Sequence, residues 1–137
     1  MRLLFDTRAL LKLLADEPGG EHVRRLVEQV EAGSVEGMVS AITLTETWYL
    51  TARKDVAAAE QAVASIEESL ELVPFEARIA IQAGRFKAAK PIPIADALIA
   101  ATASVTGATV VTDDRDFEGL GVDVADESTI CRRLKLV

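Results

Sequence analysis

Short apolar runs alternate with longer stretches of helical periodicity along this chain, and the alternation limits the folds open to it. Between the first four runs, apolar residues recur at the i, i+3, i+4 and i+7 spacing of amphipathic helices. Strands joined through helices need crossover connections and therefore lie parallel in a sheet with helices on both faces. We predict a three-layer α/β/α sandwich with a central, mostly parallel sheet whose strands are residues 2–5, 37–40, 70–74, 108–112 and 122–124.

Length and composition fit one globular domain. The 137 residues can bury roughly two thirds of their unfolded surface, and 50% hydrophobic with 27% charged residues is typical of a folded chain. No linker, repeat or low-complexity segment divides the sequence. We therefore predict a single domain over residues 1–137.

The sequence also favours a cytoplasmic protein. The single cysteine, Cys131, excludes an internal disulfide and fits a reducing compartment. Asp6 interrupts the apolar N-terminus before the core of a signal peptide can form. No apolar run approaches the ~20 residues that a membrane span needs, so we expect no membrane segment.

The net charge of −7 opposes non-specific binding to nucleic acid, which depends on neutralising phosphates with Lys and Arg. Divalent cations held by acidic side chains would reverse the field near those side chains. The charge therefore argues against a basic RNA-binding sleeve but not against a metal-dependent nuclease.

Acidic residues gather where the predicted strands end. Asp6 directly follows the first strand, and Asp114 follows the fourth. Asp96 lies in the first turn of an almost wholly apolar helix over residues 95–106, and Glu46 lies in the first turn of the helix after the second strand. Because ligands of open parallel sheets bind outside the carboxyl ends of the strands, we expect these four carboxylates to meet at one edge.

Each acid also has a purely structural explanation. Asp6 and Asp114 are good helix caps, and Thr43 followed by Glu46 is a capping-box pattern for a helix beginning at Thr43. Asp96 gains ~0.3–1 kcal/mol from the dipole of its helix. Taken one at a time, the acids do not distinguish a cap from a ligand.

Four carboxylates together, without Lys or Arg partners, repel one another and need a cation. The only histidine, His22, is interpreted as a surface residue, and Cys131 has no partner cluster. Oxygen donors alone favour Mg²⁺ or Mn²⁺ over Zn²⁺. Such ions usually meet substrate phosphate oxygens, which points to phosphoryl-transfer or phosphodiester chemistry.

Four segments together resemble the PIN domain, especially the toxin ribonucleases of VapBC toxin–antitoxin pairs. They are residues 4–7 (LFDT), 44–47 (LTET), 94–103 (IADALIAATA) and 111–117 (VTDDRDF). The resemblance covers the whole chain in order and length. It implies a parallel-sheet PIN-like fold, divalent-metal-dependent RNA cleavage, homodimers, and often a cognate antitoxin that inserts a segment near the active site.

The resemblance also implies roles for individual residues. The acidic ligands of the family match Asp6, Glu46, Asp96 and Asp114, and Asp116 matches a frequent additional acid. Asp6, Asp96 and Asp114 would hold one Mg²⁺ (or Mn²⁺), while Glu46 and Asp116 would complete a second position or place water. Thr112 matches the hydroxyl residue that orients the acids. Arg8 stands where the family usually has a small residue, and it would crowd the site or contact a substrate phosphate. The catalytic residues are therefore expected to be Asp6, Glu46, Asp96, Asp114 and Asp116.

Other classes of protein stay open on these residues. A phosphoryl-receiver-like module also gathers Asp on a parallel sheet, but it requires paired acids after the first strand and a lysine after the last, whereas Asp6 stands alone. A haloacid-dehalogenase-type phosphatase requires a second Asp where Arg8 lies. A catalytically idle α/β interaction module, whose acids serve only as caps, predicts no stabilisation by metal.

Overall fold

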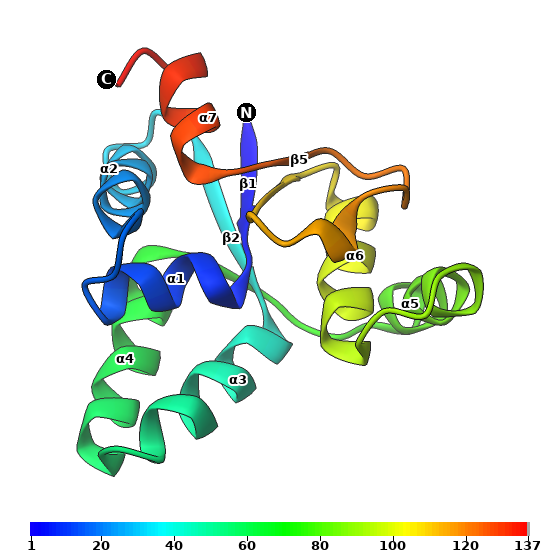
Figure 1. Ribbon diagram of the computed structural model, residues 1–137, viewed down its shortest axis with the longest axis horizontal. Coiled ribbons are helices and arrows are strands. Elements are labelled where there is room, and N and C mark those ends of the chain that lie inside the picture. The colour runs from blue at the N-terminus through cyan, green and yellow to red at the C-terminus, as the bar shows by residue number, and fades with distance from the viewer. Residues whose placement is uncertain (137) are drawn as a thin grey trace.

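Five short strands form one parallel sheet in the computed structural model, which describes residues 1–136 (Figure 1). Their order across the sheet is β3-β2-β1-β4-β5, so β1 and β4 lie side by side in its centre. This order differs from the 2-1-3-4-5 order of flavodoxin-like receivers. The strands are β1 (Arg2–Phe5), β2 (Glu36–Ser40), β3 (Glu71–Val73), β4 (Thr109–Val111) and β5 (Val124–Ala125).

Helices cover both faces of the sheet, which confirms the predicted three-layer sandwich. Successive residues of a strand point to opposite faces, and the core divides accordingly. The helices are α1 (Thr7–Leu14), α2 (Gly20–Glu31), α3 (Ala41–Ala52), α4 (Val56–Ser69), α5 (Ala77–Ala89), α6 (Ile94–Thr106) and α7 (Glu127–Arg133), with a 3₁₀ turn η1 (Arg115–Phe117). Leu4 of β1 packs with α5 and α6, whereas Leu3 and Phe5 pack with α1, α2, α4 and α7.

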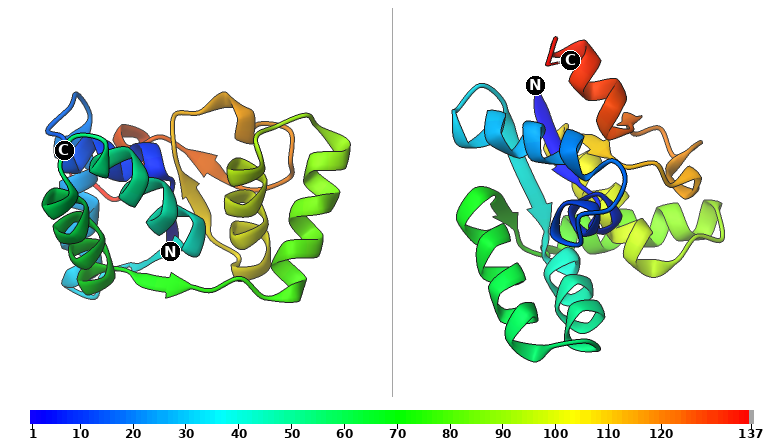
Figure 2. Two further views of the ribbon diagram at one scale, coloured as in Figure 1. Left: turned by 90° about the horizontal axis from the view of Figure 1, so that it is seen from below. Right: turned by 60° about the vertical axis from the view of Figure 1, so that its left-hand side comes forward.

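Helices α3 and α4 form an antiparallel pair that extends beyond the carboxyl edge of the sheet (Figures 1 and 2). Both described chain ends lie at the opposite edge. The carboxyl edge, where ligands of parallel sheets bind, is therefore framed by α3, α1 and the N-terminal turn of α6.

None of the helices formed by residues 1–136 combines the length and apolar character that a membrane span requires.

Apart from shifts of one residue at the ends of β2, β3, β4 and α6, three elements differ from the ranges predicted above. Helix α3 begins at Ala41 rather than Thr43, because the Ser40 side chain accepts a hydrogen bond from the Ile42 amide at 3.4 Å and caps the helix earlier. The last strand is residues 124–125 rather than 122–124, since Val110 pairs with Val124. Helix α7 was not predicted at all, although its apolar residues Ile130 and Cys131 are fully buried.

Gly20 lies where α1 and α2 meet, and its size sets how closely they approach. A methyl group at this position would overlap the carbonyl oxygen of Lys12, a backbone atom with little freedom to move. Gly20→Ala should therefore lower the free energy of unfolding by about 1–3 kcal/mol, measured by urea denaturation. Gly84→Ala is the control: no atom lies within 4 Å of the added methyl group, and we expect it to stabilise α5 by about 0.5–1 kcal/mol. Equal stability of Gly20→Ala and the wild type would contradict a tight α1–α2 crossing.

Candidate active site

The predicted acids do come from elements that end or begin at the carboxyl edge of the sheet. Asp6 directly follows β1, and Asp96 is the third residue of α6. Asp114 and Asp116 follow β4, the first as the cap of η1 and the second within it. Glu46 lies midway along α3, near Asp6. The fold thus gathers residues spaced across 110 positions of sequence at a single edge.

Asp6 occupies the N-cap position of α1, but its side chain makes no capping hydrogen bond. The carboxylate is buried and accepts a hydrogen bond from Thr112 Oγ1 to Oδ2 at 2.7 Å. The same hydroxyl oxygen accepts a hydrogen bond from the Asp114 amide at 3.0 Å. Thr112 therefore joins the end of β1 to the segment after β4.

The tightest acidic group consists of Asp96, Asp114 and Asp116. One carboxylate oxygen of each lies within 4.8 Å of the other two. Asp114 also caps η1, because its Oδ1 accepts a hydrogen bond from the Asp116 amide at 2.9 Å. For Asp114, capping and membership of the acidic group are therefore compatible, since a carboxylate has two oxygens.

This group differs from the expected ligand set of Asp6, Asp96 and Asp114. Asp116 takes the place of Asp6 in the tight group, while Asp6 lies close enough to influence the charge of Asp96. Within residues 1–136, no Lys or Arg nitrogen lies within 4.0 Å of these carboxylates. Oxygen ligands without a cationic partner suit a hard divalent cation.

The electrostatics of the site also favour a cation. Burial raises the pKa of Asp6 to about 6, although the hydrogen bond from Thr112 opposes the rise. Burial likewise raises the pKa of Asp96 to about 7, and the charges of Asp114, Asp6, Asp116 and Glu46 add to the effect. All five acids are thus close enough for their charges to interact, and each would gain from a bound divalent ion.

Glu46 is held by Thr7 and not by a capping box. The Thr7 hydroxyl donates a hydrogen bond to Glu46 Oε1 at 2.7 Å and lies 3.1 Å from the hydroxyl of Thr43. The predicted pairing of Thr43 with Glu46 is therefore wrong, because Thr43 is buried inside α3 and does not cap it. Sequence reasoning missed this role of Thr7; the signal available was its place directly after Asp6, in the first turn of α1.

Arg8 forms an ion pair with Asp113 and does not crowd the acidic group. Its guanidinium is 3.3 Å from Asp113 Oδ1, and its side chain is 62% exposed. Lys12, one turn further along α1, binds the other Asp113 oxygen at 2.8 Å and Glu127 Oε1 at 2.6 Å. Neither Lys12 nor Glu127 was singled out from the sequence, in which 115 positions separate them.

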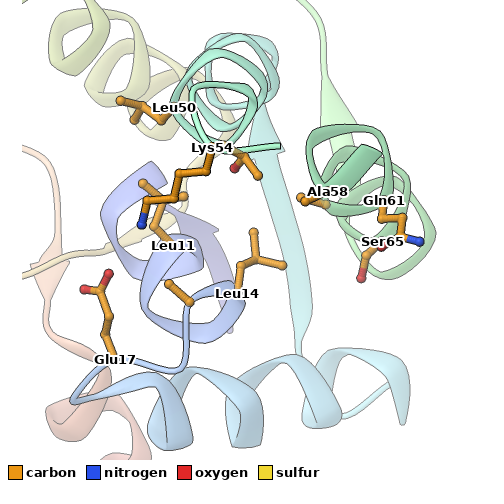
Figure 3. Close-up of a pocket in the computed structure, with 11 residues that line it drawn as sticks. Leu11, Leu14, Glu17, Leu50, Lys54, Ala58, Gln61 and Ser65 are labelled. Carbon is orange, nitrogen blue, oxygen red and sulfur yellow. The ribbon is translucent and has the colours of Figure 1, made fainter. Parts of the chain in front are cut away.

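A groove of about 720 Å³ lies between α1, α3 and α4, as Figure 3 shows. Its lining is largely apolar, with Leu11 and Leu14 from α1 and Leu50 from α3, and it carries Glu17 and Lys54 as charged residues. Helices α1 and α3 also carry Thr7 and Glu46. The groove and the acidic site therefore share two helices.

Comparisons with known proteins agree with this geometry. The PIN domain family model matches residues 3–122. No curated protein matches the chain. Among solved structures, VapBC2 from Rickettsia felis, bound to a DNA fragment from its promoter, aligns with a TM-score of 0.78 at 20% identity over 92% of this chain and 98% of that one.

Two further structures resemble the chain over nearly its whole length. DNA-bound VapBC from Salmonella typhimurium has a TM-score of 0.73 and 28% identity, covering 93% of this chain and 98% of that one. Mycobacterium tuberculosis VapC20, a toxin that cleaves the sarcin-ricin loop, has a TM-score of 0.69 and 22% identity, covering 88% and 95%. Because the family model covers most of the chain, including strands β2 to β4 and every acid of the site, the chain belongs to the PIN domain family.

Proposed function

We propose that the chain is a metal-dependent endoribonuclease that hydrolyses RNA phosphodiester bonds and acts as the toxin of a toxin–antitoxin pair. The observation that carries the proposal is the group formed by Asp96, Asp114 and Asp116, which lacks a cationic partner within residues 1–136. Membership of the PIN family and the likeness to a toxin that cleaves the sarcin-ricin loop support RNA as the substrate.

The residues fit Mg²⁺ or Mn²⁺. Asp96, Asp114 and Asp116 would hold the ion, with Asp6 as a further ligand and Glu46 at the border of the site. A bound divalent ion supplies positive charge to the phosphate and makes a coordinated water more acidic. Its preference for oxygen ligands matches this donor set.

The chain's own residues supply positioning. Thr112 fixes Asp6 relative to Asp114, and Thr7 holds one oxygen of Glu46, which leaves Glu46 Oε2 to orient water or substrate. Neutral hydroxyl donors fix these carboxylates without neutralising them. The acids therefore keep the negative charge that a divalent ion requires.

Asp96→Asn should reduce RNA cleavage by about 100-fold or more, because a neutral amide is a much weaker ligand for Mg²⁺. Cleavage of structured RNAs, including tRNAs and a sarcin-ricin loop fragment, is measured with Mg²⁺, with Mn²⁺ and with chelator. Asp123→Asn, the same change at an exposed position before β5, serves as the control and should cut at the wild-type rate. Full activity of folded Asp96→Asn would refute the assignment.

Stabilisation by Mn²⁺ should depend on pH. Because the pKa values of Asp6 and Asp96 are raised to about 6 and about 7, protons compete with the ion at pH 5 but not at pH 8. At a fixed Mn²⁺ concentration, set at 100 times the Kd at pH 8, we expect the ion to add ~2.7 kcal/mol of stability at pH 8 and far less at pH 5, measured by thermal melting. An idle module would show no such shift at either pH.

The metal-free protein provides the control for this experiment. A carboxyl whose folded pKa lies above its unfolded value destabilises the fold as pH rises from about 4 to about 7, since the folded state binds the proton more tightly. In chelator, Asp96→Asn should therefore melt at a higher temperature than the wild type at pH 8, with the difference shrinking toward pH 4. A lower melting temperature at pH 8 would instead indicate that the charge of Asp96 stabilises α6 through the helix dipole.

An antitoxin is the proposed protein partner, because solved structures that resemble the chain are toxin–antitoxin complexes. We propose that an apolar antitoxin segment packs in the groove between α1, α3 and α4. The groove is largely apolar, and its walls α1 and α3 also hold Thr7 and Glu46. A segment bound there would lie beside the acidic site.

Ala58→Glu should abolish copurification with the cognate antitoxin, because it places a charge on the α4 wall of the groove. Ala64→Glu makes the same change on the same helix at an exposed position outside the groove lining and should leave the complex intact. Both variants alone should retain RNA cleavage. Copurification of Ala58→Glu at the wild-type level would place the antitoxin elsewhere.

A further inference from the structure

The segment that presents Asp114 and Asp116, residues 112–118, has little internal structure with which to resist charge repulsion. Its only regular element is the three-residue turn η1, and its internal contacts include short-range hydrogen bonds such as Asp116 amide to Asp114 Oδ1. The segment carries Asp113 as a third acid and approaches Asp96 and Asp6. Like charges at this spacing push the segment away from α6. Its position therefore needs support from outside.

Lys12 supports the segment from the face of the sheet that α1 covers. Its ammonium contacts Asp113 Oδ2 at 2.8 Å and Glu127 Oε1 at 2.6 Å, which links α1, the 112–118 segment and α7. The side chains of Lys12 and Glu127 are only 15% and 7% exposed, so water competes little for this ion pair, whereas Asp113 is 37% exposed. The pair with Glu127 restricts the movement of Lys12, because separating it leaves a buried charge unpaired. The ammonium is thereby held where it contacts Asp113.

Lys90 supports the same segment from the opposite face, at the C-terminal end of α5. Its ammonium donates to the backbone carbonyls of Asp116 at 2.9 Å and Glu118 at 2.8 Å, with the Arg115 carbonyl at 3.4 Å. One ammonium group thus binds several backbone carbonyls at the end of η1. The charge of Lys90 is therefore directed at backbone carbonyls of the segment.

Both lysines leave the cation-binding oxygens untouched. Lys12 binds Asp113, the neighbour of Asp114, and Lys90 binds the carbonyl of Asp116 rather than its carboxylate. We propose that Lys12 and Lys90 are positioning residues that clamp the 112–118 segment from two faces of the sheet, so that Asp114 and Asp116 meet Asp96 while remaining free to hold a divalent cation. The inference rests on the proposed metal-dependent function and adds two residues to it.

The positive charge of a lysine and its role in positioning the ligands predict opposite changes in metal affinity when the lysine is removed. The clamp can therefore be tested. A lysine near a cation site repels the cation, so by charge alone its removal strengthens metal binding. If the lysine instead holds the ligands in place, its removal weakens binding, because residues that orient metal ligands typically contribute 10- to 100-fold in affinity. The direction of the change in the Kd for Mn²⁺ therefore separates the two roles.

The experiment measures Mn²⁺ binding to the metal-free protein by calorimetric titration at pH 8, without RNA. Lys12→Met and Lys90→Met should each raise the Kd about tenfold. Lys90→Arg keeps a charged donor for the carbonyls and should restore most of the affinity. Lys135→Met removes the same charge from an exposed position outside the groove and the site, and it should leave the Kd within about twofold of the wild type.

The outcomes distinguish the clamp from the function on which it rests. If the wild type does not bind Mn²⁺, the proposed metal-dependent function fails, and the clamp fails with it. If the wild type binds Mn²⁺ and Lys90→Met binds it equally well or more tightly, the clamp alone is overturned. Should Lys12→Met fail to fold by circular dichroism, Lys90→Met and Lys90→Arg decide, since Lys90 contacts only backbone carbonyls of the segment.

Discussion

Mutual repulsion among five carboxylates at the carboxyl edge of the sheet is the constraint on which the rest of the site depends. Burial and the four neighbouring acids together raise the pKa of Asp96 to about 7, so the folded chain holds these charges at a cost. The sheet order makes the arrangement unavoidable: β1 and β4 are adjacent and in register, so Phe5 lies beside Val111 and the residues after both strands emerge together. The repulsion lowers the stability of the metal-free fold, and a bound divalent cation would relieve it.

Two kinds of group hold the acids in place: neutral hydroxyls and positively charged ammonium groups. Hydroxyl groups of Thr112 and Thr7 contact carboxylates directly, while the cations of Lys12 and Lys90 contact a neighbouring side chain and backbone carbonyls. A hydroxyl orients a carboxylate without cancelling its charge. An ammonium at the same place would occupy the position of the metal. Positive charge is therefore kept one residue or one backbone group away from the ligands.

Sequence reasoning located the acids but not all of their contacts. The strands around Asp6 and Asp114 were predictable because buried parallel strands are short apolar runs, and the carboxyl edge follows from the parallel connections. The capping box at Thr43 was wrong because Ser40, three residues earlier, competes for the same helix end. Which carboxylate oxygens approach most closely, and hence the presence of Asp116 in the tight group, depends on the path of η1, for which periodicity carries no signal.

The net charge of −7 now has a consistent interpretation. An acidic chain repels RNA, and the acids at the carboxyl edge repel a phosphate most strongly where cleavage would occur. A divalent ion held by Asp96, Asp114 and Asp116 would reverse the field at that one place. A phosphate would then be attracted to the edge where the acids alone repel it. In an acidic PIN domain the bound ion would thus supply, at the point of cleavage, the positive charge that the chain as a whole lacks.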